Sequence, residues 1–208
     1  MKKKAIFGGT FDPIHNGHLH IAYEALYKFN LDKVIFMPSG NPPHKTHKVI
    51  TDANVRCKLV ELAIKNEEKF EISYYEVLKK GLSFTYETLE FFNKSEKDTQ
   101  WYFITGVDCL MEIDTWKNVK KILSNCKFTV FNRTGYNIYD ILYKKNEVEE
   151  KYKEKIEFLN IPILDISSTK IRKMIKNGQE VFYLLPHTVN EYIKDNRLYR
   201  SRGTGNVE

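Results

Sequence analysis

The stretch Gly8-Gly-Thr-Phe-Asp-Pro-Ile-His-Asn-Gly-His18 marks the point where the chain changes from an extended to a helical pattern. The apolar residues 5–7 precede it, and Leu19 opens a run in which apolar residues recur at helical spacing. A strand, a glycine-rich loop and a helix are therefore predicted in this order. Because a helix N-terminus attracts anions, His15 and His18 lie where they would donate hydrogen bonds to phosphate oxygens.

The same alternation of short apolar runs and longer helical patterns continues along the chain. Strands are predicted at 4–7, 33–37, 70–74, 101–105, 128–131 and 156–159. Helices are predicted at 19–29, 52–66, 85–92 and 119–123, with a charged helix at 140–155 and two more helices after the last strand. Strands that alternate with crossover helices indicate an α/β fold with a doubly wound parallel sheet. Ligands bind such sheets beyond the carboxyl ends of the strands.

The length of 208 residues predicts a single domain over residues 1–200, with a core at 1–160 and a C-terminal helical subregion at 161–200. Residues 201–208 offer nothing to pack and are expected to be a disordered tail. The hydrophobic content of 42% is enough for a sizeable core. A net charge of +6, with both signs mixed along the chain, fits a protein that handles phosphorylated small molecules and does not require nucleic acid.

The cellular setting is predicted from the cysteines and from the lack of long apolar runs. The three cysteines form no paired motif, which is typical of reduced thiols in a cytoplasmic protein. The basic residues Lys2–Lys4 are followed by too few apolar residues for a signal peptide, and no run approaches transmembrane length. We therefore expect a soluble cytoplasmic protein without a membrane partner.

The residue types of the opening stretch favour phosphate binding over metal binding. Gly8 and Gly9 are expected to form a tight turn after the first strand, and Gly17 to let the backbone turn into the helix. The spacing matches neither a dinucleotide-binding glycine motif nor a P-loop. No cysteine or carboxylate stands at ligand spacing from His15 and His18, so no protein-held metal is predicted. The alternative is that both histidines only cap and pack the helix start.

The opening stretch resembles the (H/T)xGH signature of the nucleotidyltransferase superfamily. The C-terminal Ile166-Ser-Ser-Thr-Lys-Ile-Arg172 is similar to the superfamily's second motif, ISSTxIR. The resemblance implies a Rossmann-like nucleotidyltransferase fold with a C-terminal helical part, and a catalytic role for His15, His18 and Arg172. It also implies that ATP and its phosphates are bound by Gly8, Gly9, Thr10, Phe11, Gly17, Gly106, Asp108, Ser167, Ser168 and Thr169.

Five further stretches resemble the bacterial nicotinate-nucleotide adenylyltransferases, and with the two motifs the match runs from residue 4 to about 199. They are Pro38–Lys45, Leu82–Leu89, Phe103–Asp108 with Trp116 downstream, Arg133 with Gly135 and Tyr136, and Leu184–Pro186. The resemblance implies adenylyl transfer from ATP, bound with Mg²⁺, to nicotinate mononucleotide, which gives nicotinate adenine dinucleotide and pyrophosphate in NAD biosynthesis. It implies that the mononucleotide is bound by His44, Lys45, Thr85, Trp116 and Arg133.

The same assignments follow in part from the residue types. Thr85 and Trp116 offer a hydrogen bond and a flat ring, which suit a planar aromatic carboxylate. Trp116 has a core role as its alternative, and for Trp101 the core role is preferred. Asp108 is placed to accept from ribose hydroxyls or adenine, or else to cap the next helix. His44 and Lys45, after two stiffening prolines, fit a phosphate contact or an exposed loop.

Two departures from the family pattern and three alternatives stay open at this point. Thr134 stands where the family usually has proline. Lys117 stands where many members have tyrosine, so the nicotinate carboxylate would be bound by a backbone N–H near Thr85 or by the Lys117 amide. The enzyme alternatives act on nicotinamide mononucleotide or on both mononucleotides. A distant alternative is a nucleic-acid-binding protein, suggested by Lys2–Lys4 and by arginines near the C-terminus. A homo-oligomer is also possible.

Overall fold

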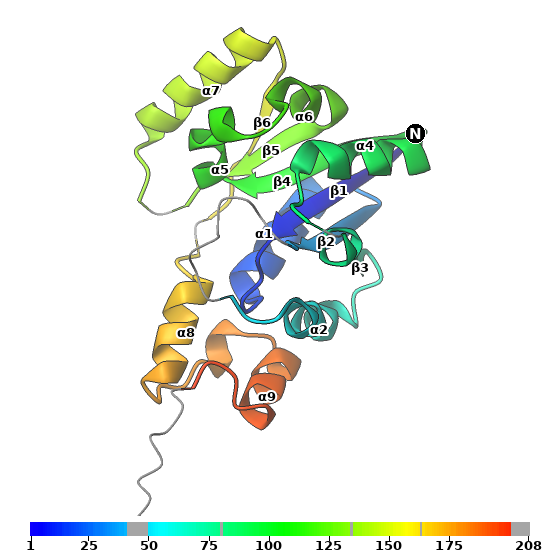
Figure 1. Cartoon of the computed structure of the whole chain (residues 1–208). Helices are drawn as coiled ribbons and strands as arrows, with labels where there is room; N and C mark the ends of the chain where they lie inside the picture. Colours follow the sequence, from blue (N-terminus) through cyan, green and yellow to red (C-terminus); the bar gives the residue numbers. More distant parts are fainter. Residues whose placement is uncertain (41–49, 80, 134, 163, 201–208) are drawn as a thin grey trace, which may run out of the picture.

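The computed structural model describes residues 1–40, 50–79, 81–133, 135–162 and 164–200. The predictions for His44, Lys45, Thr134 and the 201–208 tail lie outside these residues. In the described chain, six parallel strands form one sheet in the order β3-β2-β1-β4-β5-β6 (Figure 1). The strands are β1 (Lys2–Gly9), β2 (Lys33–Pro38), β3 (Phe70–Ile72), β4 (Thr99–Gly106), β5 (Lys127–Phe131) and β6 (Ile156–Leu159). The predicted doubly wound parallel sheet and all six predicted strands are confirmed.

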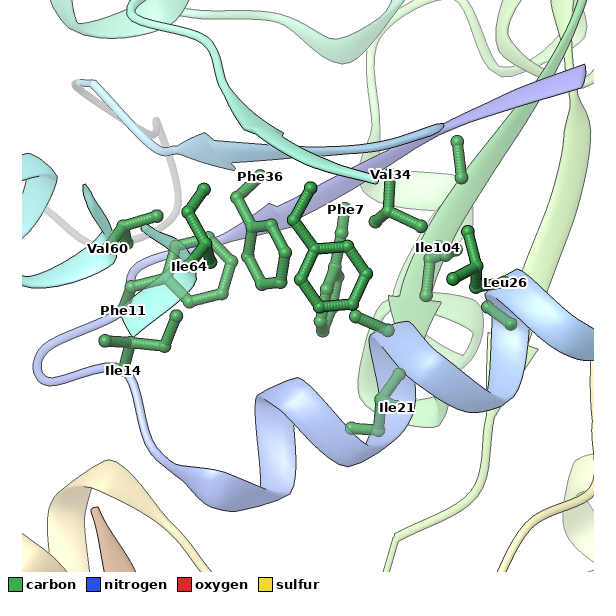
Figure 2. Packing of buried hydrophobic residues seen from close by; sticks show 14 of the residues in the cluster. Phe7, Phe11, Ile14, Ile21, Leu26, Val34, Phe36, Val60, Ile64 and Ile104 are labelled. Atoms are coloured by element: carbon green, nitrogen blue, oxygen red, sulfur yellow. The ribbon is translucent and has the colours of Figure 1, made fainter. Parts of the chain in front are cut away.

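Helices cover both faces of the sheet, because alternate strand residues point to opposite sides. On one face Ala5 and Phe7 of β1 pack against α1 (Asn16–Lys28), α2 (Ala53–Ile64) and the C-terminal helices (Figure 2). On the other face Ile6 packs with residues of α4 (Thr85–Ser95), α5 (Val107–Met111), α6 (Val119–Asn125) and α7 (Ile138–Tyr152). The two short helices α3 (Tyr75–Leu78) and η2 (Ile113–Thr115) complete this part of the chain.

The strand order reverses between β1 and β4, since the chain builds the sheet outward from β1 in one direction and from β4 in the other. Residues 4–9 of β1 pair with β2, and residues 2–7 of β1 pair with β4. The carboxyl ends of β1 and β4 therefore flank the switch point, where open α/β sheets bind ligands.

The chain after β6 adds α8 (Ser168–Lys176), η3 (Phe182–Leu184) and α9 (His187–Asp195) to the α1 and α2 side of the sheet. Ile171, Val189 and Ile193 belong to the same buried cluster as β1. The Thr188 hydroxyl donates to the Leu62 carbonyl at 2.8 Å, which joins α9 to α2. In the described residues, no helix has the length and apolarity needed to cross a membrane.

The structure corrects two expectations near the opening stretch. Gly8 and Gly9 are not a turn after the first strand: both lie inside β1 and pair with Met37 and Pro38. The chain turns after them, where Phe11 adopts φ 51°. The first helix begins at Asn16, before the predicted range of 19–29, so Gly17 lies inside the helix, and His18 lies in its first turn as expected.

Candidate active site

Three adjoining pockets lie along the carboxyl ends of β1, β4 and β5. The first pocket, of about 260 Å³, is lined by the loop after β1, both histidines, Asp108 and the start of α8, and is called the phosphate pocket after the ligand predicted from the sequence. The aromatic pocket, of about 220 Å³, adjoins it through Gly8–Thr10 and Asp108 and extends to Thr85 and Trp116. The outer pocket, of about 240 Å³, adjoins the phosphate pocket on the other side through His15 and Arg133. The three pockets together form one elongated ligand cleft.

His15 and His18 are stacked at the start of α1. Their ring centroids are 3.7 Å apart, and the ring planes differ by 25°. The His15 backbone N–H donates to Nδ1 of His18 at 3.2 Å. Because a backbone amide only donates, Nδ1 of His18 must carry the lone pair, and in the neutral ring the proton sits on Nε2. The fold therefore makes His18 a hydrogen-bond donor through Nε2.

Both histidines are neutral in the free protein. Burial lowers the pKa of His15 to about 3, with a further contribution from the positive charge of Arg133. Burial also holds the pKa of His18 well below 6.5, helped by His15 and Arg133. Nδ1 of His15 is buried without a hydrogen-bond partner among the described residues. An anion bound here would meet two imidazoles and a guanidinium, each of which can donate a hydrogen bond to it.

The lowered pKa values predict that acid destabilises the free protein. In the unfolded chain a histidine titrates near pH 6.5, but folded His15 stays neutral down to about pH 3. Since the unfolded state takes up the proton first, the stability loss begins as pH falls below 6.5 and ends near the folded pKa. We expect His15 to lower the free energy of unfolding by about 2 kcal/mol between pH 7 and pH 5.

Urea unfolding of the unmodified chain and of His15→Asn at both pH values isolates this contribution. Asparagine is favoured at the helix N-cap, so the variant keeps the helix start. The stability of His15→Asn should fall less between pH 7 and pH 5. Equal losses in the two proteins would contradict the assigned protonation state.

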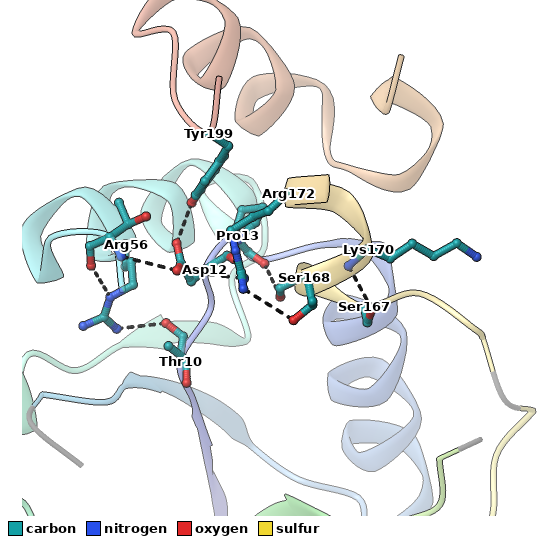
Figure 3. A network of polar contacts seen from close by, with 11 residues as sticks. Thr10, Asp12, Pro13, Arg56, Ser167, Ser168, Lys170, Arg172 and Tyr199 are labelled. Atoms are coloured by element: carbon teal, nitrogen blue, oxygen red, sulfur yellow. Dashed lines mark hydrogen bonds and ion pairs between the residues drawn. The ribbon is translucent and has the colours of Figure 1, made fainter. Parts of the chain in front are cut away.

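The second motif is joined to the first by hydrogen bonds between α8 and the loop after β1 (Figure 3). Nη1 of Arg172 donates to the Asp12 carbonyl at 2.6 Å, and the Ser168 hydroxyl donates to the Pro13 carbonyl at 2.8 Å. Ser167 is the N-cap of α8 and accepts from the Lys170 amide, while the Thr169 hydroxyl accepts from Arg172 at 3.4 Å. Residues of both motifs, 155 to 160 positions apart, thus line one pocket.

Arg56 is a buried residue beside the cleft to which the sequence analysis assigned no role. It is only 3% exposed, on α2. Its guanidinium donates at 2.8–2.9 Å to the carbonyls of Thr51, Thr10 and Ser39. One buried side chain therefore fixes the ends of the loops after β1 and β2. The helical spacing indicates that Arg56 is buried. It lies three positions before Leu59 and four before Val60, and therefore on the apolar face of the predicted helix.

Asp12 and Tyr199 were also missed. Asp12 belongs to the opening stretch but received no role, and it is 4% exposed. The Tyr199 hydroxyl donates to Oδ1 of Asp12 at 2.8 Å across 187 positions (Figure 3). No local sequence pattern predicts a contact between residues so far apart in the chain.

Gly17 and Gly106 are required for space, in contrast to the expected backbone role of Gly17. Gly17 is an ordinary helical residue, and a Cβ added there would lie 3.1 Å from Cε1 and Nδ1 of His15. A Cβ on Gly106 would lie 2.3 Å from Oδ1 of Asp108. These glycines therefore leave room for the His15 ring and the Asp108 carboxylate.

Asp108 and Arg133 face each other where the phosphate pocket meets the strand ends. Asp108 does not cap α5 through its side chain, because the N-cap is Gly106 and no side-chain cap bond forms. Oδ1 of Asp108 is buried without a partner among the described residues, and its Oδ2 lies 4.0 Å from Nη1 of Arg133. The geometry favours a ligand contact for Asp108. Arg133 lines the phosphate and outer pockets, and the structure does not bring it to Thr85 and Trp116.

The remaining predicted residues occupy the cleft in different ways. Gly8, Gly9 and Thr10 line both the phosphate and the aromatic pocket. Phe11 is 1% exposed, and its ring packs edge-on against His18 with centroids 5.0 Å apart. Phe11 therefore supports the His18 ring and leaves its backbone for a ligand. Trp101 is buried in the core, as preferred from the sequence.

The aromatic pocket brings Thr85 and Trp116 together as predicted. Thr85 is the first residue of α4, whose N-cap, Phe84, forms no side-chain cap bond. The Trp116 ring meets the rings of Phe103 and Phe128 edge-on. Nζ of Lys117 lies 4.6 Å from the Phe84 ring centroid at the edge of this pocket. The pocket thus offers flat apolar walls and an open helix N-terminus.

The charges of the aromatic pocket are uneven. Among the charged side chains that line it in the described chain, Glu76, Asp108 and Glu112 are carboxyl groups and Lys117 is the single cation. Glu76 accepts from the Thr88 hydroxyl at 3.0 Å, and burial raises the pKa of its carboxyl group. Within the described residues, no carboxylate lies at ion-pairing distance from Lys117. The ammonium lies over the rings of Phe84 and Tyr86, and its charge contributes to lowering the pKa of the Glu87 carboxyl group.

Comparisons with known proteins show the family to which the chain belongs. A family model described as cytidylyltransferase-like matches residues 6–174. A probable nicotinate-nucleotide adenylyltransferase of Clostridium novyi (strain NT) is 62% identical over 200 residues, which cover 96% of this chain and 100% of the relative. The probable nicotinate-nucleotide adenylyltransferase of Clostridium tetani is 56% identical with the same coverage. The chain belongs to the nicotinate-nucleotide adenylyltransferase family.

A solved nicotinate-nucleotide adenylyltransferase shares the fold. The nicotinic acid mononucleotide adenylyltransferase of Plasmodium falciparum, complexed with NaAD, superposes with a TM-score of 0.76 and 21% identity, covering 96% of this chain and 98% of that chain. The predicted nucleotidyltransferase fold is confirmed. As a member of the nicotinate-nucleotide adenylyltransferase family, the chain is an enzyme that transfers nucleotidyl groups.

Proposed function

We propose that this enzyme transfers the adenylyl group of ATP to nicotinate mononucleotide and releases nicotinate adenine dinucleotide and pyrophosphate. The observation that carries the proposal is the continuity of the phosphate pocket with the aromatic pocket at the switch point of the sheet. One pocket suits the reacting phosphates and the other suits a pyridine ring with a carboxylate. The curated relatives of high identity bear the same activity in their names.

The reaction needs alignment and charge stabilisation more than proton transfer. The 5′-phosphate of the mononucleotide is ionised at neutral pH, and one of its oxygens attacks the α-phosphorus of ATP. A phosphorus–oxygen bond forms there while the bond to the departing pyrophosphate breaks, so no general base is required. Alignment of two bound reactants contributes up to about 7–11 kcal/mol in well-oriented models.

The donors for the developing negative charge lie around the phosphate pocket. Nε2–H of His18, the His15 ring and the guanidinium of Arg172 are proposed to contact the α-phosphate and the pyrophosphate, together with the N-termini of α1 and α8. Arg133 is proposed to contact the reacting phosphates, which include the 5′-phosphate of the mononucleotide, because it lies near enough to both histidines to lower their pKa values. Asp108 is proposed to accept hydrogen bonds from a ribose.

ATP is proposed to enter as its Mg²⁺ complex. The phosphate oxygens of ATP and water are the ligands that Mg²⁺ prefers, and they hold the ion in many nucleotide-dependent enzymes. The metal ion is thus treated as part of the substrate. It would neutralise charge on the pyrophosphate as it departs.

The acid end of the mononucleotide is proposed to lie in the aromatic pocket. The nicotinate ring would stack on the Trp116 ring. Its carboxylate would lie beside Thr85 at the N-terminus of α4, where no side chain caps the helix. Three carboxyl groups line this pocket, so the positive charge of Lys117 is needed to favour an anionic substrate over a neutral amide. His44 and Lys45 remain predicted phosphate contacts.

Replacement of Lys117 by methionine should reduce the preference of the enzyme for nicotinate mononucleotide over nicotinamide mononucleotide. We expect kcat/KM for nicotinate mononucleotide to fall ~5-fold, the effect of one exposed charge pair, and kcat/KM for nicotinamide mononucleotide to stay nearly constant. The Lys120→Met variant is the matched control, because Lys120 is exposed on α6 and lines no part of the aromatic pocket. An unchanged ratio of the two kcat/KM values in Lys117→Met would contradict this role.

Identification of the products tests the proposed function. Incubation with ATP, Mg²⁺ and nicotinate mononucleotide should yield a dinucleotide with the mass of nicotinate adenine dinucleotide and one pyrophosphate per dinucleotide. Pyrophosphate without the dinucleotide, or no conversion by folded protein, would contradict the proposal.

A further inference from the structure

The chain returns to the active site after its last helix. Beyond α9 the Leu198 amide donates to the Ile193 carbonyl at 3.0 Å. Arg197 and Tyr199 both adopt left-handed backbone conformations, with φ 51° and 63°. Such conformations are unfavourable for residues other than glycine, so contacts of the segment must hold them. The result is that the Tyr199 side chain points into the loop after β1 (Figure 3).

Tyr199 meets a carboxylate whose other contacts lead to the phosphate pocket. Oδ1 of Asp12 accepts from the Tyr199 hydroxyl at 2.8 Å, and Oδ2 accepts from the Thr51 amide at 3.3 Å. Burial and the neighbouring Asp12 raise the pKa of Tyr199, so its hydroxyl is a dependable donor. Asp12 also binds Arg172 through its backbone carbonyl.

The distance between Arg172 and the Asp12 carboxylate is informative. Nη1 of Arg172 lies 3.9 Å from Oδ2 of Asp12, which is too far for a hydrogen bond. The Asp12 carboxylate takes its hydrogen bonds from Tyr199 and Thr51 instead. The guanidinium is therefore held near Asp12 by the carbonyl through Nη1 and contacts the Thr169 hydroxyl through Nη2. Its remaining N–H groups face no acceptor that the described residues provide within hydrogen-bond distance, and a ligand can use them.

We propose that Tyr199 is a positioning residue that acts through Asp12 to keep Arg172 directed at the phosphates, an inference that rests on the proposed adenylyl transfer. A buried carboxylate that loses one donor takes another. Without the Tyr199 hydroxyl, the nearest cation is Arg172, which would close onto Asp12 in a bidentate pair and withdraw from the phosphate pocket. The C-terminal segment thus completes the active site.

A double-mutant cycle of Tyr199→Phe with Arg172→Ala tests the proposal on the full-length chain. Tyr199→Phe keeps the packed ring and removes only the hydroxyl. We expect it to lower kcat about tenfold in the unmodified enzyme, as for the loss of one hydrogen bond to a charged group, and less than about twofold when Arg172 is already alanine. Tyr139→Phe, an exposed tyrosine on α7, is the control and should leave kcat unchanged.

The outcomes separate a positioning role from a structural one. Equal losses in the two backgrounds, as a merely weakened fold would give, overturn the proposal. So does full activity of Tyr199→Phe. The unmodified enzyme is assayed in the same series. If it forms no dinucleotide, the proposed function is contradicted, and not only the role of Tyr199.

Discussion

Replacement of His18 by asparagine is expected to lower kcat about 100-fold or more. Removal of one preorganised donor from a transition state costs roughly 2.7–4 kcal/mol in enzymes where this has been measured. In this chain the donor is defined by the fold, because the His15 amide occupies Nδ1 of His18 and leaves the proton on Nε2. Steady-state pyrophosphate release at saturating substrates measures the loss.

A matched variant distinguishes the lost donor from a disturbed helix start. Asparagine at position 18 places its amide oxygen near Nδ1 and still accepts from the His15 amide, but it does not reach the position of Nε2. Glutamine reaches the position of Nε2 with an N–H group. His18→Gln should therefore retain more activity than His18→Asn. A folded His18→Asn protein with kcat within about threefold of the unmodified enzyme would contradict the donor role.

Replacement of Arg56 by methionine is expected to lower the free energy of unfolding by about 3–5 kcal/mol. The substitution keeps a long apolar stem and removes three hydrogen bonds from a side chain that is 3% exposed. The carbonyls of Thr51, Thr10 and Ser39 would be left without this donor, and each unsatisfied buried acceptor costs about 1–3 kcal/mol. Urea unfolding at neutral pH measures the change.

The control for Arg56 lies on the same helix. Lys58 is exposed on α2 and pairs with Glu61 at 3.2 Å, and its replacement by methionine should change the stability by no more than about 0.5–1 kcal/mol. Nucleotide affinity should fall in Arg56→Met and not in Lys58→Met, because only Arg56 fixes the loops that line the phosphate pocket. A loss below about 1 kcal/mol in Arg56→Met would contradict its role as a clamp.

The sheet was predictable because its strands are short, apolar and separated by helical patterns. Adjacent strand residues such as Ile6 and Phe7 face opposite helix layers, so both must be apolar. The continuous apolar run predicts the strand without knowledge of its partner strands. The ends of the helices were harder to predict from the sequence than the strands. The first helix was predicted to begin at Leu19, since Asn16 and Gly17 carry no apolar signal, yet His15 already acts as its N-cap.

The site was predictable where a motif is local and not where it depends on distant contacts. The two motifs predicted His15, His18 and Arg172 as site residues, and the structure brings all three together in one pocket, whereas their catalytic roles stay predictions. Arg133 was predicted to bind the mononucleotide from its resemblance to a family loop, and the structure adds that it lies near His15 in the same pocket, which that local pattern does not indicate. The contact of Tyr199 with Asp12 spans 187 positions and follows only from how α9 packs on α2.

If one cleft joins ATP to nicotinate mononucleotide, pyrophosphate release in the presence of ATP and Mg²⁺ must depend on this acceptor. The rate should be compared at equal concentrations of nicotinate mononucleotide, nicotinamide mononucleotide and no acceptor. We expect rapid pyrophosphate release with nicotinate mononucleotide, slower release with nicotinamide mononucleotide and almost none without an acceptor. Release that is equally fast without an acceptor, or absent with the acid, would contradict this expectation.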